Sequence, residues 1–168
     1  MEWRAYLLAP DTPPEGRPYP FPSEVRKQRS APMREMAAEA GLTIADRDWV
    51  SNSRSALEAA EYAREHDLFE PFHRAVFVAY FAEGRDIGKH DVLSDIASAV
   101  GLDARDMIAA LDGGRYSDRV NEDLSLSRQL GLTGVPAFII GNRAIVGAQP
   151  YEVFEHVMGL LGREKRTA

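Results

Sequence analysis

Apolar residues between positions 53 and 130 recur every three or four positions, which is the spacing of amphipathic helices. Glycines divide this stretch into separate helices because glycine favours helix ends. Asp67 and Asp103 stand where N-terminal caps are needed. A further helix is expected to start at residues 30–32, with Pro32 in its first turn, and to end at Gly41. The predicted helices are 33–40, 55–63, 68–83, 92–100, 104–111 and 115–130.

The two ends of the chain have a different pattern. Residues 3–8 alternate weakly and carry aromatic side chains, so we expect a strand. Residues 137–140 and 144–146 flank the turn Gly141-Asn142 and predict a hairpin, followed by a helix over 151–161 and a frayed polar tail over 163–168. A hairpin alone is barely stable in water, so we expect the early strand to join it in one sheet. The proline-rich stretch 10–22 predicts an extended loop.

The composition narrows the class of protein. The chain has 168 residues, of which 45% are hydrophobic and 27% charged, as expected for one globular domain. Its net charge of -6 argues against a nucleic-acid surface, and it has neither a long apolar run for a membrane span nor a signal-peptide pattern at its start. Because the sequence contains no cysteine, disulfides and thiol nucleophiles are excluded within it, which fits a cytoplasmic location.

Few side chains suggest catalytic chemistry. The four histidines are scattered, so we expect no metal site and no cofactor, and no serine stands in a G-x-S-x-G context. The acidic residues Asp46, Asp48, Asp103 and Asp106 are expected to be caps or solvated groups. Five aromatic residues are expected in the core of the helical region, with a hydrophobic groove for peptides as the alternative; they are Phe69, Phe72, Phe77, Tyr80 and Phe81.

The ordered set of local motifs resembles the DsbA-like branch of the thioredoxin superfamily. Within that branch it is most similar to the FrnE-type proteins, near the 2-hydroxychromene-2-carboxylate isomerases and the kappa-class glutathione transferases. The stretches that carry the resemblance are 3–16, 52–60, 77–87, 134–140 and 147–150.

The resemblance implies an α/β thioredoxin-like fold with a large all-helical insertion. The whole chain, 1–168, would be a single domain, with residues 1–12 and 115–162 as the thioredoxin core and residues 30–114 as the insertion. Family members begin with a strand, an active-site motif and a helix, whereas Met1 stands about where the second strand of the family opens. We therefore expect an N-terminally truncated fold whose sheet lacks its inner strand. A second copy of the chain would close that gap and form a homodimer.

Three functions follow from the resemblance. The first is the thiol-disulfide oxidoreductase class, with no catalytic residue in this chain and hence no activity alone. The second is a glutathione-dependent isomerase or transferase, in which glutathione would be bound. The third is a non-enzymatic module that binds peptides or associates with itself.

The resemblance also implies three substrate-binding residues. Val135 would present its backbone to an extended peptide or protein substrate across a cis bond to Pro136, while the alternative is a trans proline that opens a strand. Asn52 would contact substrate or glutathione, and the alternative is a helix cap.

Overall fold

The computed structural model describes residues 1–163, and its contacts divide the chain into two units. One unit joins residues 1–8 to residues 123–168, and the other contains residues 9–122. The expected division into a core and a 30–114 insertion stays a prediction.

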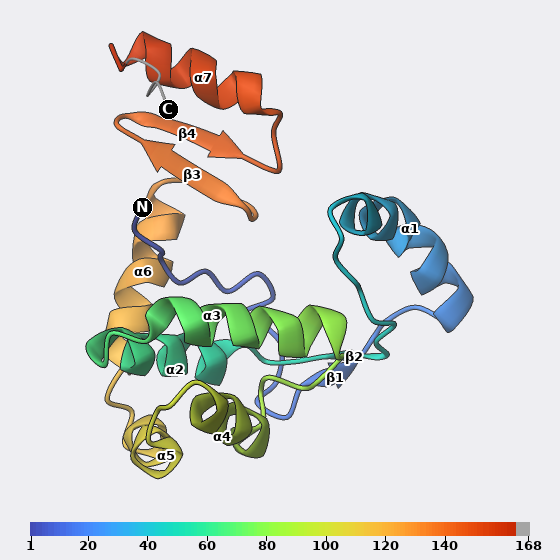
Figure 1. The fold of residues 1–168 in the computed structure, drawn as a ribbon, viewed down its shortest axis with the longest axis vertical. Helices are drawn as coiled ribbons and strands as arrows, with labels where there is room; N and C mark the ends of the chain where they lie inside the picture. Colours follow the sequence, from blue (N-terminus) through green and yellow to red (C-terminus); the bar gives the residue numbers. More distant parts are fainter. Residues whose placement is uncertain (164–168) are drawn as a thin grey trace. The chain divides into compact units, whose positions relative to one another are not determined.

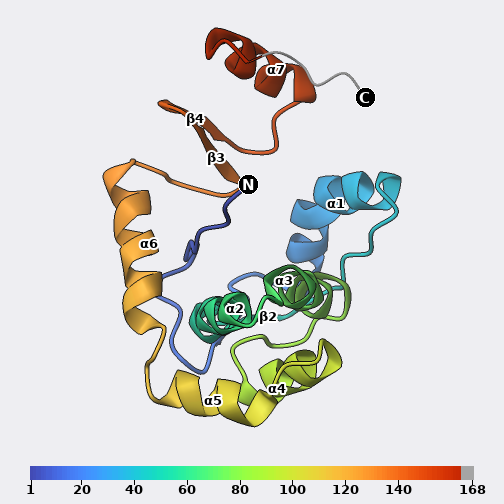
Figure 2. The same cartoon turned by 60° about the vertical axis from the view of Figure 1, so that its left-hand side comes forward.

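The larger unit is built from helices (Figures 1 and 2). In chain order they are α1 (Ser23–Glu39), α2 (Arg54–Glu65), α3 (Phe69–Phe77), a π-helical turn (Val78–Ala82), α4 (His90–Ala99), α5 (Ala104–Asp112) and the start of α6 (Ser117–Gln129). The core lies between α2, α3, α4 and α5, where Tyr62, Phe72, Leu93 and Met107 are almost fully buried. The predicted cap is confirmed at Asp103, whose side chain accepts a hydrogen bond from the Asp106 N–H at 3.0 Å. Within residues 1–163, no helix has both the length and the apolar content that a membrane crossing requires.

Helix α1 starts seven residues before the predicted start at Ser30. Pro22 precedes its first turn, and Pro32 lies inside the helix, so the prediction that Pro32 marks the start was wrong. No residue of α1 is buried, so packing does not explain the extra length. Arg26 and Arg34 instead pair with Asp46, at 3.2 and 3.6 Å.

A small two-stranded sheet lies in the same unit. Strand β1 (Arg17–Pro18) pairs antiparallel with β2 (Trp49–Val50). A proline is tolerated in β1 because each of its strands is an edge strand. The predicted loop 10–22 therefore holds a short strand that its proline content hid.

Two expectations about α3 were wrong. Asp67 does not cap this helix: it has a φ of 58°, and it closes α2 through a hydrogen bond from its N–H to the Arg64 carbonyl. Phe77 is not in the core, because half of its surface (50%) is exposed. It belongs to a row of rings along α3 in which His73 lies 5.1 Å from Phe69 and 4.7 Å from Phe77.

The smaller unit contains the hairpin that the sequence predicts. Strand β3 (Ala137–Ile140) pairs antiparallel with β4 (Arg143–Val146), with Phe138 opposite Ile145, and α7 (Tyr151–Leu160) follows (Figure 1). The rings of Phe138 and Phe154 meet edge to face at 5.0 Å, which fixes α7 against one face of the hairpin.

The predicted strand over residues 3–8 does not form. The sheets of the described residues contain only β1 with β2 and β3 with β4. The backbone of this segment instead bonds a side chain, since the Ala5 N–H donates to Asp123 Oδ2 at 2.8 Å. Asp123 is buried and also accepts from Arg4 at 2.9 Å, so one carboxylate of α6 holds the segment.

Candidate polypeptide-binding site

The loop between α6 and β3 begins at a glycine-terminated helix end. Gly131 has a φ of 65°, and its N–H bonds the Arg128 carbonyl while the Leu132 N–H bonds the Ser127 carbonyl at 3.0 Å. This pattern satisfies carbonyls at the helix end and requires the left-handed conformation that glycine adopts easily. The Tyr6 hydroxyl donates to the Leu132 carbonyl at 3.4 Å, so the N-terminal segment holds the start of the loop.

The loop ends at the Val135–Pro136 peptide bond, which is cis, the isomer that the family resemblance implies. The Pro136 carbonyl accepts a hydrogen bond from the Gly147 N–H at 2.8 Å, which ties the end of the loop to the residue after β4. Val135 is 49% exposed. Among the described residues, neither its N–H nor its carbonyl has a hydrogen-bond partner.

The backbone of β3 alternates between its partner strand and the outside. In an antiparallel pair, every second residue exchanges hydrogen bonds with the residue opposite. Because Pro136 bonds Gly147, the next bonded pairs are Phe138 with Ile145 and Ile140 with Arg143. The N–H and C=O of Ala137 and Ile139 therefore point away from β4.

This outer edge of β3 is open in the described part of the chain. Within residues 1–163, no third strand lies beside it, and neither Ala137 nor Ile139 has a partner for its outward groups. The missing N–H of Pro136 does not interrupt the edge, because that position faces β4. The edge therefore offers the donors and acceptors that an added strand requires.

The outer edge of β4 differs, because part of it is already bonded. The Gln149 Nε2 donates to the outward carbonyl of Val146 at 3.0 Å. Gln149 comes from the turn that leads into α7, and its own N–H bonds the Gly147 carbonyl. Among the described residues, one outward carbonyl of β4 is thus bonded by a side chain, whereas no outward group of β3 is.

One face of the hairpin is apolar and exposed. Phe138 and Ile145 lie on the face that packs α7, and Ile145 is buried. On the opposite face, Ile139 is 48% and Val146 is 43% exposed, and Ala137 and Ala144 lie between them. Both faces are therefore apolar, a pattern typical of strands that are buried on both sides.

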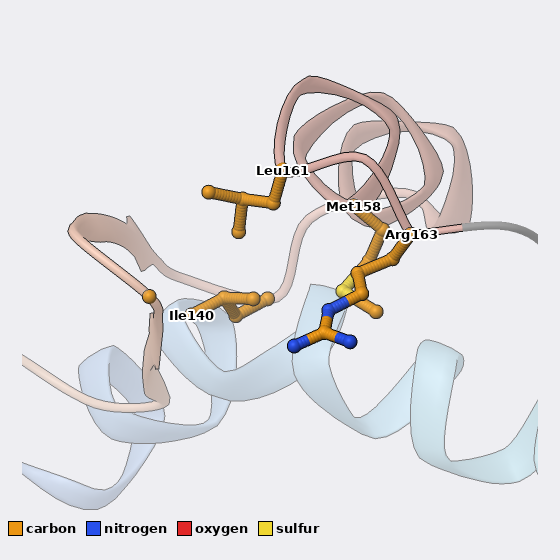
Figure 3. Close-up of a pocket in the computed structure, with 5 residues that line it drawn as sticks. Ile140, Met158, Leu161 and Arg163 are labelled. Carbon is orange, nitrogen blue, oxygen red and sulfur yellow. The ribbon is translucent and has the colours of Figure 1, made fainter.

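A hollow of about 280 Å³ lies at the far end of β3, beside the hairpin turn (Figure 3). Ile140 and Gly141 line it from the hairpin, while Met158 and Leu161 line it from the end of α7 and Arg163 from the residues after it. Leu161 fits closely here, because a side chain at Gly141 would come within 3.2 Å of it. The hollow lies at the end of β3 that is farther from Val135, so it is not a continuation of the loop between α6 and β3.

Asn52 has both of its side-chain groups in structural hydrogen bonds. Its Nδ2 donates to the Thr12 carbonyl at 2.7 Å, and its Oδ1 accepts from the Arg54 N–H at 2.9 Å at the start of α2. The bond from Arg54 satisfies one backbone donor in the first turn of α2, although the N-cap residue itself is Ser53. Asn52 belongs to the larger unit, whereas Val135 and Pro136 belong to the smaller one. A role for these three residues in substrate binding stays a prediction.

Residues 1–163 contain no group of three or more acidic or histidine side chains that could hold a metal ion.

His73 stands between the rings of Phe69 and Phe77, and its burial there lowers the pKa of its imidazole. The open edge of β3 could not be found by a search for reactive side chains, because its functional groups belong to the backbone.

The fold and the loop define a DsbA-like thioredoxin domain. Residues 1–159 match the model of the DsbA-like thioredoxin domain family, and the chain belongs to that family.

The chain is also similar to three known proteins. The protein YwbO of Bacillus subtilis (strain 168) is 30% identical over 158 residues, which cover 92% of this chain and 78% of YwbO. The crystal structure of a DsbA oxidoreductase candidate from Streptomyces coelicolor has a TM-score of 0.84 and 26% identity, over 98% of this chain and 76% of the other. That of a protein disulfide isomerase candidate from Nitrosomonas europaea has a TM-score of 0.68 and 16% identity, over 87% and 78%, and shows likeness of fold alone.

Proposed function

We propose that this chain is a polypeptide-binding member of the thiol-disulfide oxidoreductase class that does not itself exchange disulfides. Thiol-disulfide exchange needs a thiolate that attacks a disulfide sulfur, and the sequence contains no cysteine. Methionine cannot replace the thiolate because its sulfur carries no ionisable proton. Binding is then the part of the family's activity that this chain can provide.

One observation carries the proposal, namely the open backbone groups that run from Val135 along the outer edge of β3. An extended polypeptide that adds to such an edge gains main-chain hydrogen bonds whatever its sequence. Each bond contributes about 0.5–1.5 kcal/mol, so several in a row are needed for useful affinity. The exposed side chains of Val135 and Ile139 add apolar contact beside the same edge.

The proposal is tested by the binding of an unfolded polypeptide that has no free thiol, such as the S-carboxymethylated insulin B chain. We expect measurable binding by fluorescence anisotropy. Ile139→Pro should weaken it at least tenfold, because the substitution removes an outward N–H without touching a bond between β3 and β4. Val146→Pro removes an outward N–H from the other edge and is the matched control. Equal binding by the two variants, or no binding by the unaltered chain, would contradict the proposal.

Two further assays separate this function from its alternatives. Insulin reduction by this chain should stay at the uncatalysed rate, and clear activity would refute the argument from the missing thiol. Glutathione should produce no heat of binding in calorimetry; binding would favour a glutathione-dependent isomerase or transferase instead.

The proposal extends to two finer points. A FrnE-type position within the family rests on the local motifs of the sequence. A cytoplasmic location is suggested by a chain without cysteine, which gains no disulfide in an oxidising compartment. Subcellular fractionation of cells that express the tagged chain tests the location.

A further inference from the structure

The open edge of β3 is complementary to itself. An antiparallel strand that meets a second copy across a two-fold axis places donors opposite acceptors in both directions. With Ala137 opposite Ile139 of the second copy, the outward N–H and C=O of each residue meet a partner. The β3–β4 bonds of each copy are untouched, because they use the alternate residues.

The charges near the edge permit this contact. Residues 135–140 contain no charged side chain, in a chain where 27% of residues are charged. Proteins commonly protect edge strands with lysine, proline at outward positions or bulges. None of these devices is present at Ala137 or Ile139, and the proline at position 136 faces inward. A second copy would therefore bring no like charges together.

The other edge of the hairpin limits growth. Gln149 occupies the Val146 carbonyl on β4, so the two edges of the hairpin do not offer the same groups. Pairing through β3 alone joins two copies and then stops, whereas pairing through both edges would produce a filament. The hairpin packs α7 on one face only, and two further strands would extend its sheet and add to its stability.

We infer that, in the absence of a client polypeptide, β3 pairs with β3 of a second copy and forms a continuous four-stranded sheet. This inference rests on the proposed function in one respect only: the second copy and the bound polypeptide use the same outer edge of β3. Dimer formation and client binding therefore exclude each other, and the dimer covers the edge until a client displaces the second copy.

Sedimentation velocity over a range of concentrations tests the dimer without any peptide. We expect a dimer for the unaltered chain and for Val146→Pro, and a monomer, or an affinity at least tenfold lower, for Ile139→Pro. Ile139→Lys is the second variant: it keeps the backbone and places a charge on an exposed side chain, so it should also give a monomer with unchanged circular dichroism. A monomer for the unaltered chain at all concentrations, or equal loss in Val146→Pro, would overturn the inference.

Addition of the S-carboxymethylated B chain then separates the two proposals. Conversion of the dimer into a monomer that carries peptide supports both. A dimer that does not bind the peptide contradicts the proposed function but is consistent with the inferred dimer. A chain that binds the peptide but never forms a dimer contradicts the inference but is consistent with the proposed function.

Discussion

The buried carboxylate of Asp123 accepts a hydrogen bond from the backbone N–H of Ala5 at 2.8 Å, across 118 positions of sequence. Replacing Asp123 by alanine leaves that N–H without a partner. We expect the free energy of unfolding to fall by about 1–3 kcal/mol in urea titrations. Asp123→Asn keeps one acceptor oxygen but turns an amide donor towards Arg4. Its free energy of unfolding should therefore fall by less than that of the alanine variant.

Glu122→Ala is the control for this prediction, since Glu122 is an exposed carboxylate of the same helix whose ion pair with Arg119 is long, at 3.8 Å. Its effect should stay within about 0.5 kcal/mol. Equal effects at positions 122 and 123 would show that the carboxylate does not hold the N-terminal segment.

Alanine substitutions at Gly16 and Gly41 distinguish the cost of steric contact from the cost of backbone conformation. Gly16 and Gly41 both have positive φ, at 81° and 72°, but only Gly16 is crowded, by the Trp49 ring and by the Val50 carbonyl oxygen at 2.9 Å from the position of an added Cβ. Gly41→Ala should cost about 1 kcal/mol for conformation alone. Gly16→Ala should cost clearly more and disturb the pairing of β1 with β2. Thermal unfolding of the two variants provides the comparison, and similar melting temperatures would contradict it.

Phe72 and Phe77 test the corrected position of the helical core. Phe72 is fully buried, so Phe72→Ala should destabilise the chain by about 3–5 kcal/mol. Phe77 is half exposed and contacts His73 and Phe81, so Phe77→Ala should cost only about 1 kcal/mol. Comparable losses in chemical denaturation would place Phe77 in the core after all.

Tyr62 should make stability fall at high pH. Burial, followed by the hydrogen bond from its hydroxyl to Asp106, raises the pKa of Tyr62 to about 12 from an ordinary value of 10.0. The folded chain then keeps the proton that the unfolded chain loses. The resulting contribution of Tyr62 to the free energy of unfolding is complete below pH 10 and disappears as the pH rises through about 12.

Tyr62→Phe removes this titration, so its stability should depend less on pH between 10 and 12 than that of the unaltered chain. The exposed ring of Tyr19 provides the control, Tyr19→Phe. Urea unfolding at a series of pH values measures the difference, and parallel curves for all three proteins would refute the assignment.

The parts of the fold that could be predicted from sequence are those fixed by local signals. The Gly141-Asn142 turn between two apolar runs predicts the β3–β4 hairpin, and Asp103 predicts the start of α5; both are confirmed. These signals need only residues that are adjacent in sequence.

The parts that were missed depend on distant partners. Residues 3–8 have the pattern of a strand, but a strand needs a neighbour, and the backbone there bonds Asp123 instead. Pro32 resembles a first-turn proline, but the exposed helix α1 continues through it. The π-helical turn at Val78–Ala82 leaves no sequence pattern that differs from an ordinary helix. A motif pointed to Val135, whose role in binding stays a prediction, whereas the open edge beside it could be recognised only from the hydrogen-bond register of β3 and β4.

Hydrogen exchange of single backbone amides tests the central claim most directly. It should be measured with and without the S-carboxymethylated B chain, at a concentration where sedimentation shows a monomer. The account predicts that the peptide slows exchange at Ala137 and Ile139, which point outwards, and has little effect at Phe138 and Ile140, which already bond β4. Unchanged exchange at Ala137 and Ile139, or protection at Ala144 and Val146 instead, would contradict it.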